Sequence, residues 1–233
     1  TSSVSGADVS ERIFSHLPAT LELGLVSLIL ALVIAVPLAV VSSKKPGGFL
    51  DSAIRSGAVA IYALPVFLTS MLLRVAFSIW IPILPTNGRV GIEYQVELTT
   101  NPDLTGWYLI DSLFLGDIPM LLSALAHLVL PALAIAILIA ANLTRVIRSN
   151  LVFAFQTEAL EFANSLGLSR KSLLWPHAAK LVAPQVLTSF GYSITSIVGG
   201  FVYAEVSFEW RGLGSLLTES VLKRDFEVLQ GIV

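Results

Sequence analysis

The sequence contains no cysteine and few charged residues. The absence of cysteine excludes disulfides, thiolate metal sites and cysteine nucleophiles. Charged residues make up 13% of the chain, about half the share that is usual in soluble domains. A soluble fold of 233 residues could not bury a chain that is 55% hydrophobic, so the composition indicates a protein that lies in lipid. A formal net charge of −2 argues against a nucleic-acid partner.

The sequence also lacks a phosphate-binding loop and an initiating methionine. No lysine follows a glycine, so the Gly-x-x-x-x-Gly-Lys-Ser/Thr pattern is absent and the chain has no such site for ATP. The chain starts at Thr1 without a signal-peptide pattern and stops at Val233, where an apolar run restarts. We therefore interpret it as a piece of a longer protein, truncated at both ends and lacking a spanning helix at each.

What the sequence does contain is long apolar stretches. A helix needs about 20 mostly apolar residues to cross a bilayer, and four stretches meet that length: residues 21–43, 56–81, 118–144 and 181–204. A buried helix of a soluble protein could imitate one of them but hardly four in succession. The prediction is an all-α, polytopic membrane helical bundle that forms one transmembrane domain over residues 1–233.

Basic residues predict the orientation of this bundle. They gather in two of the connecting segments, as Lys44, Lys45, Arg55, Arg145, Arg148, Arg170, Lys171 and Lys180. The loop 82–117 holds several acidic residues and the lone Arg89. Because Lys and Arg accumulate on the cytoplasmic side, we expect segment 149–180 to be cytoplasmic, and the loop 82–117 and the segment 205–228 to face outward.

The cytoplasmic segment has the pattern of two short helices around a glycine. Its apolar residues share one face of the first helix: Phe155, Ala159, Phe162, Ala163 and Leu166. Gly167 favours a helix end, and Ser169 is a suitable N-cap for the second helix. Two interpretations stay open on this pattern alone. The first helix lies on the membrane surface, or it docks in a groove of a partner; Glu158 and Glu161 suit an anionic lipid surface poorly.

This segment resembles the cytoplasmic "EAA" loop of permease subunits of binding-protein-dependent ABC transporters. Glu161-Phe162-Ala163 matches E-A-A with Phe162 as a departure, and Gly167 matches the glycine that follows after three intervening residues. The general family's later Leu-Pro is absent, because Ala179-Lys180 stands there, whereas Pro184 is similar to the proline of the peptide-permease branch. The resemblance implies that the loop is a coupling helix for an ATPase subunit, built from Glu158, Glu161, Phe162, Ala163, Gly167, Leu168 and Ser169.

Further blocks resemble the dipeptide, oligopeptide and nickel branch of that family, in the same order along the chain. They are residues 18–23, 108–113, 127–132, 205–214 and 223–226. The block EVSFEWRGLG at 205–214 has Arg211 where the family usually has proline. The resemblance implies that the outer segment contacts the binding protein or forms an outer gate, with Glu205, Phe208, Trp210, Gly212, Gly214 and Asp225 as its residues.

A few single residues carry separate expectations. Arg74 lies late in the second stretch, where we expect it to extend to the outer interface or to form an ion pair within the bundle. We expect Glu22 and Glu205 to be hydrated at the outer boundary, and Trp210 to lie at the membrane interface. His127 has no nearby acidic or histidine partner, so we expect a hydrogen-bonded structural role and no metal site.

The function expected from the resemblance is that of a type I ABC importer permease of a bacterial or archaeal inner membrane. It would be non-catalytic and bind no cofactor, with ATP and Mg on partner subunits. The partners would be a second homologous permease, two ATP-binding subunits, an extracytoplasmic solute-binding protein and membrane lipid. The alternatives are a self-sufficient secondary transporter or channel, which would need ionisable residues near the bilayer midplane, and a structural scaffold. The substrate stays open between peptides, nickel, glutathione and oligosaccharides.

Overall fold

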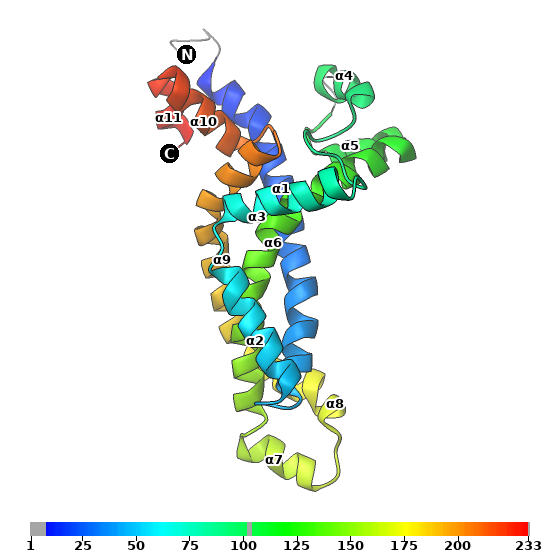
Figure 1. Cartoon of the computed structure of the whole chain (residues 1–233), viewed down its shortest axis with the longest axis vertical. Helices are drawn as coiled ribbons and strands as arrows, with labels where there is room; N and C mark the ends of the chain where they lie inside the picture. The colour runs from blue at the N-terminus through cyan, green and yellow to red at the C-terminus, as the bar shows by residue number, and fades with distance from the viewer. Residues whose placement is uncertain (1–7, 102–103, 233) are drawn as a thin grey trace. The chain divides into compact units, whose positions relative to one another are not determined.

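The structure, a computed structural model, describes residues 8–101 and 104–232. Every regular element in these residues is a helix, which confirms the all-α prediction. Figure 1 shows the elements, which are in chain order α1 (Val9–Ser43), α2 (Phe49–Tyr62), α3 (Val66–Arg74), the π-helix η1 (Val75–Trp80), α4 (Ile92–Thr100), α5 (Tyr108–Leu115), α6 (Ile118–Ala154), α7 (Glu158–Ser165), α8 (Arg170–Leu173), the π-helix η2 (Leu174–Ala178), α9 (Ala179–Ser207), α10 (Leu213–Lys223) and α11 (Phe226–Ile232).

The chain divides into two compact units. Unit 1 is made of residues 1–27, 65–135 and 198–233, and unit 2 of residues 28–64 and 136–197. The long helices α1, α6 and α9 each contribute residues to both units. The predicted outer loop belongs to unit 1, and the predicted coupling segment belongs to unit 2.

Two helices of the described chain are long and apolar enough to cross a membrane. They are α1 with 35 residues and α6 with 37, and they contain the first and third predicted stretches. α2 and the segment Val66–Trp80 count as a third crossing only if the two pieces act as one span. The fourth predicted stretch falls within the 29-residue helix α9, and its crossing of the membrane stays a prediction.

The faces of α1 show how a helix is adapted to lipid on one side and protein on the other. Ala31, Ala35 and Ala39 recur every fourth residue and are fully buried, so neighbouring helices can approach this face closely. Ile29 and Val33 lie on another face, where about half or more of each side chain is exposed. An exposed apolar stripe on so long a helix is expected where the solvent is hydrocarbon.

The second predicted stretch, 56–81, is not a single helix. α2 ends at Tyr62, and a new helix begins at Val66 after Pro65, whose φ is −64° and ψ 145°. Proline has no N–H to continue the ladder and disfavours the helical conformation in the residue before it, Leu64. Composition and length predicted the apolar stretch, whereas the break follows from this one residue.

Unit 1 includes the ends of the chain that the structure describes. α10 and α11 pack side by side (Figure 1). Arg12 of α1 connects to both, because its Nη1 lies 3.3 Å from Asp225 Oδ2 and its Nη2 lies 3.8 Å from Glu219 Oε1. A hydrogen bond from Lys223, one turn along α10, lowers the pKa of the Glu219 carboxyl. Asp225 is buried, and this network holds α11 against the start of α1.

Candidate functional site

The predicted coupling segment forms a short helix, α7, whose ends are fixed by local hydrogen bonds. At its C-terminus the Gly167 N–H donates to Asn164 O at 3.0 Å and the Leu168 N–H donates to Ala163 O at 3.3 Å. Gly167 has a φ of +87°, which completes a Schellman motif. Glu158 and Glu161 occupy the first turn, where negative charge complements the helix dipole. The predicted glycine stop is confirmed.

Most of α7 is exposed, including its large apolar side chains. Phe162 is 65% exposed and Leu166, just after the helix, is 67% exposed. Leu160 is the residue that is buried, and the sequence pattern did not single it out. The apolar face predicted from the spacing thus lies mostly on the surface of unit 2, which leaves apolar area available for a partner.

α8 connects this segment to the end of α1. Ser169 is its N-cap, and its Oγ accepts from the Ser172 N–H at 3.2 Å, as predicted. Arg170 donates from Nη1 to Lys44 O at 2.9 Å, and its guanidinium lies 4.4 Å from the centre of the Phe155 ring. Figure 1 shows α7 and α8 joined by the loop that contains Gly167. The chain from α7 is thus connected through α8 to the Lys44 carbonyl.

A second connection in unit 2 is a buried cluster around Asp51, here called the Asp51 cluster, which also contains Ser42, Gly47 and Arg148. Arg148 of α6 donates from Nε to Asp51 Oδ1 at 2.9 Å and from Nη2 to Oδ2 at 2.6 Å. Ser42 Oγ and the Gly47 N–H donate to the same carboxylate at 2.6 and 2.7 Å. The side chain of Asp51 is fully buried, so these four bonds replace its hydration. The cluster joins α1, α2 and α6, and its Arg148 lies six residues before the end of α6 at Ala154.

The outer motif EVSFEWRGLG forms a tight buried turn between α9 and α10 in unit 1. Glu205 accepts hydrogen bonds from Thr20 Oγ1 at 2.6 Å and from the Ser215 N–H at 2.9 Å. Thr20 Oγ1 in turn accepts from the Leu213 N–H at 2.8 Å. A Cβ on Gly212 would collide with Glu205 Oε1 and Thr20 Oγ1, so only glycine fits at this position. This packing explains why the motif has a glutamate at position 205 and a glycine at position 212.

The expectation that Glu22 and Glu205 are hydrated is wrong, because both are buried in unit 1. Arg89 of the predicted outer loop donates from Nη2 to Glu22 Oε2 at 2.6 Å, and the Leu109 N–H donates to Glu22 Oε1 at 2.9 Å. The guanidinium of Arg89 also stacks on the Tyr108 ring at 3.7 Å. Partners distant in sequence thus compensate the charge that water was expected to solvate.

Two other expectations also need correction. Trp210 is 1% exposed rather than at a membrane interface, and its Nε1 donates to Ala19 O at 2.9 Å. Arg74 forms no ion pair in the described part of the chain, and its expected extension to the outer interface stays a prediction. Its Nη1 donates to Ser207 O at 2.8 Å, at the C-terminus of α9, where the helix dipole favours a cation. The expected structural role of His127 fits its Nδ1 contact with Ser123 O at 2.7 Å.

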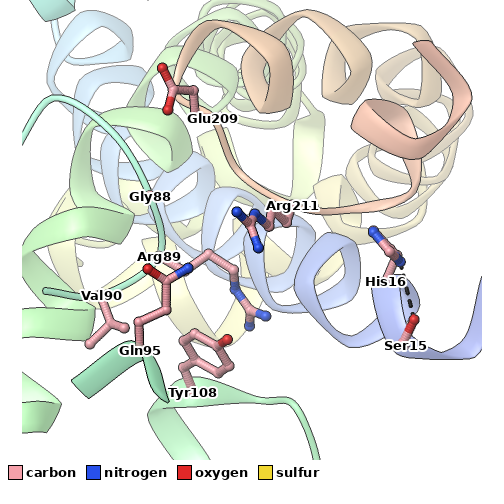
Figure 2. Close-up of a pocket in the computed structure, with 9 residues that line it drawn as sticks. All are labelled: Ser15, His16, Gly88, Arg89, Val90, Gln95, Tyr108, Glu209 and Arg211. Atoms are coloured by element: carbon pink, nitrogen blue, oxygen red, sulfur yellow. Dashed lines mark hydrogen bonds between the residues drawn. The ribbon is translucent and has the colours of Figure 1, made fainter. Parts of the chain in front are cut away.

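All six predicted outer-site residues are buried in unit 1: Glu205, Phe208, Trp210, Gly212, Gly214 and Asp225. Their role as contacts for a binding protein stays a prediction, and burial gives them a structural role. The exposed charged residues of the same motif are Glu209 and Arg211. Together with Arg89, Tyr108 and His16 they line a pocket of about 200 Å³, shown in Figure 2, where Arg89 extends toward Tyr108 and Arg211 lies on the neighbouring segment. The sequence did not point to Arg89, although it was the lone cation of an acidic loop.

No group of three or more His, Cys, Asp or Glu residues that could hold a metal ion occurs among the residues of ranges 8–101 and 104–232. The clusters of unit 1 and unit 2 are ion pairs and hydrogen bonds among side chains and backbone.

Residues 13–233 match the protein family described as "Binding-protein-dependent transport system inner membrane component". The match covers nearly the whole chain, so the chain belongs to this family of membrane-embedded transport permeases. The resemblance based on the loop around Gly167 is thereby confirmed.

Among curated proteins, the chain is similar to the dipeptide transport system permease protein DppB of Escherichia coli (strain K12), with 30% identity over 96% of this chain and 65% of that protein. It is 33% identical to the oligopeptide transport system permease protein AppB of Bacillus subtilis (strain 168), over 97% of this chain and 65% of that protein. The putrescine export system permease protein SapB of Escherichia coli (strain K12) is 26% identical over 98% of this chain and 70% of its own length. The chain spans a little under two thirds of the length of the first two relatives.

Proposed function

We propose that the chain is the translocation subunit of an ATP-driven importer that moves peptides or similar small solutes. It would cross the membrane several times, pair with a homologous permease subunit and receive solute from an extracytoplasmic binding protein. Two ATP-binding subunits would hydrolyse ATP with Mg, and this chain would bind neither. The family match and the peptide permeases among its relatives support this proposal.

One observation carries the coupling role. Phe162 of α7 and Leu166 just after it are exposed, while the end of α7 is fixed at Gly167 and Arg170 of α8 bonds Lys44, the residue after α1. A short helix with an exposed apolar side suits insertion into a partner's groove. A helix without such connections could bind a partner but would be linked to the membrane helices only through its neighbouring residues in the chain.

The connections suggest how ATP would drive transport. Closure of the ATPase pair would displace both coupling helices, one from each permease. In this chain the displacement would reach α1 through Arg170 and the Lys44 carbonyl. It would reach α6 directly, because α7 follows α6 in the chain. The Asp51 cluster would keep α1, α2 and α6 together during the movement. Two permease states would then differ in their affinity for the ATP-bound motor, which is what alternating access requires.

The outer contact would involve exposed residues of unit 1. Glu209 and Arg211 are the exposed charged residues of the motif, and Asn87 Nδ2 donates to Glu209 Oε1 at 2.9 Å. Charged groups at the rim of an interface set association rate and partner choice. We therefore assign the binding-protein contact to Glu209 and Arg211, and the support of that surface to Glu205 and Gly212.

The substrate class rests on the relatives. Two are named for dipeptides and oligopeptides, and a third is named for putrescine export. Import fits the binding-protein-dependent family description, and peptides fit the first two names. Co-purification of the binding protein with its bound solute would identify the substrate directly.

The test of the coupling role is truncation of Phe162 in the reconstituted complex. Phe162→Ala should weaken binding of the ATPase subunits by about thirtyfold, since a buried aromatic anchor typically contributes about 2 kcal/mol. Phe49→Ala is the matched control, because Phe49 is 87% exposed in the same unit and lies outside the coupling segment. ATPase affinity and solute-stimulated hydrolysis would both be measured. If Phe162→Ala leaves both unchanged, or if the control weakens them equally, the assignment of α7 as the coupling helix is wrong.

A further inference from the structure

Unit 2 contains a pocket of about 400 Å³ at the C-terminal end of α1. One side of it is apolar, formed by Val36, Pro37 and Val40 of α1 together with Trp175 of η2. Its remaining polar lining includes three cations, Lys44, Arg170 and Lys171. The pocket is thus amphipathic, with an apolar wall that continues the apolar stretch of a membrane-crossing helix.

The charge of this pocket is of one sign. No acidic residue is among its lining residues. The guanidinium of Arg170 is positioned by the Lys44 carbonyl and the Phe155 ring. Lys44 and Lys171 are exposed, and the salt bridges found in the described part of the chain include neither of them. A cationic surface next to an apolar wall is complementary to a molecule with an anionic head and an apolar tail.

We propose that this pocket binds one anionic phospholipid of the cytoplasmic leaflet. Its phosphate would lie between Lys44 and Lys171, and an acyl chain would lie along Val40 and Pro37. Basic pockets between membrane helices on the cytoplasmic side select anionic head groups. The pocket would lie at the depth of the lipid head groups, because α1 ends at Ser43 and basic residues immediately follow its apolar stretch. A free phosphate would leave the apolar wall and Trp175, which is 63% exposed, without a partner.

The lipid would act on the coupling segment. Its phosphate would contact Lys171 on α8 and Lys44 after α1, and thereby reinforce the bond between Arg170 and the Lys44 carbonyl. Anionic lipid would then strengthen the connection between α7 and α1. Transport would accordingly depend on the lipid composition of the inner leaflet, independently of which solute is carried.

Tryptophan fluorescence offers a direct binding test, because Trp175 lines the pocket. The protein, with the subunits that co-purify with it, would be placed in nanodiscs of phosphatidylcholine with increasing amounts of brominated phosphatidylglycerol. The difference in quenching between the unaltered protein and Trp175→Phe reports bromine next to Trp175. We expect saturable quenching by the brominated anionic lipid and weak quenching by brominated phosphatidylcholine.

The two lysines are then tested by substitution. Lys44→Gln and Lys171→Gln should each weaken lipid binding about fivefold, the effect of about 1 kcal/mol per cation near an anionic leaflet. Lys45→Gln is the matched control, because Lys45 is exposed beside Lys44 but does not line the pocket. Equal effects at Lys44 and Lys45, equal quenching by both brominated lipids, or the absence of quenching at Trp175 would each overturn the proposal. The last result would mean that protein covers the pocket.

Discussion

At the scale of single residues, Asp51 is the point where three helices of unit 2 meet. Its carboxylate accepts four hydrogen bonds, two of them from Arg148. Asp51→Asn removes the charge and leaves the partly buried guanidinium of Arg148 with one fewer acceptor, which typically costs about 2 kcal/mol. We expect a lower thermal midpoint in detergent. Ser52→Ala, at the exposed neighbouring position, should leave the midpoint unchanged, and equal midpoints for both variants would contradict the role of the cluster.

Gly212 gives a second residue-scale prediction, for unit 1. Any Cβ here overlaps Glu205 Oε1 and Thr20 Oγ1, both of which are held by hydrogen bonds. Gly212→Ala should therefore destabilise the protein by about 1–3 kcal/mol, the usual range for overpacking. Gly199→Ala is the control in the same unit, because its Cβ would meet no atom within 4 Å and alanine favours a helix. The two variants would be compared by thermal unfolding, and a destabilised Gly199→Ala would refute the packing explanation.

The sequence predicted residues whose role is local and missed those whose role depends on distant partners. Gly167 and Ser169 were predicted because a helix end is decided by a few neighbouring residues. Glu22 was expected to be hydrated because its partner, Arg89, is 67 positions away. A buried ion pair is invisible in a local pattern. The lone Arg89 in an acidic loop was the available signal of an ion pair, but the sequence does not show which acidic residue it pairs with.

At the scale of elements, α7 depends on its C-terminal stop. Gly167 has a φ of +87°, and a non-glycine residue in this region costs about 1–2 kcal/mol. Gly167→Ala should therefore fray the end of α7 and weaken ATPase binding, whereas Gly167→Asn should retain more binding, because asparagine tolerates this conformation better. Hydrogen exchange at residues 163–168 would report the fraying. Equal exchange and equal affinity in both variants would show that the stop is unimportant for docking.

Other element boundaries were only partly predictable. α1 begins well before its predicted stretch and α6 ends well after its own, because a polar residue such as Arg148 continues a helix as readily as an apolar one when it finds a partner. Hydropathy marks where a chain can lie in lipid, and helices extend beyond that region. At Pro65 the helices are instead shorter than the apolar stretch, because one proline divides a stretch that is long enough to span the membrane.

At the scale of the whole molecule, composition predicted the class of protein before any motif was considered. Low charge and long apolar stretches require lipid as the solvent, and the two helices α1 and α6 agree with that prediction. The exposed Phe162 and Leu166 were not predictable as exposed, because periodicity shows that a helix has an apolar face but not what covers it. In this family the covering surface is expected on another polypeptide, which the sequence of one subunit does not describe.

The orientation of the chain is the whole-molecule prediction on which the proposed function depends, and the absence of cysteine makes it directly testable. Single cysteines at Ser165 in the coupling segment and at Glu93 in α4 would both be exposed. Because basic residues mark the cytoplasmic side, a membrane-impermeant thiol reagent added to intact cells should label Glu93→Cys and should label Ser165→Cys only after the membrane is opened. Ile29→Cys, on the exposed apolar face of α1, should resist the reagent in both conditions, because hydrocarbon excludes it. Labelling of Ser165→Cys in intact cells would place α7 out of reach of any cytoplasmic ATPase, and the coupling role could not stand.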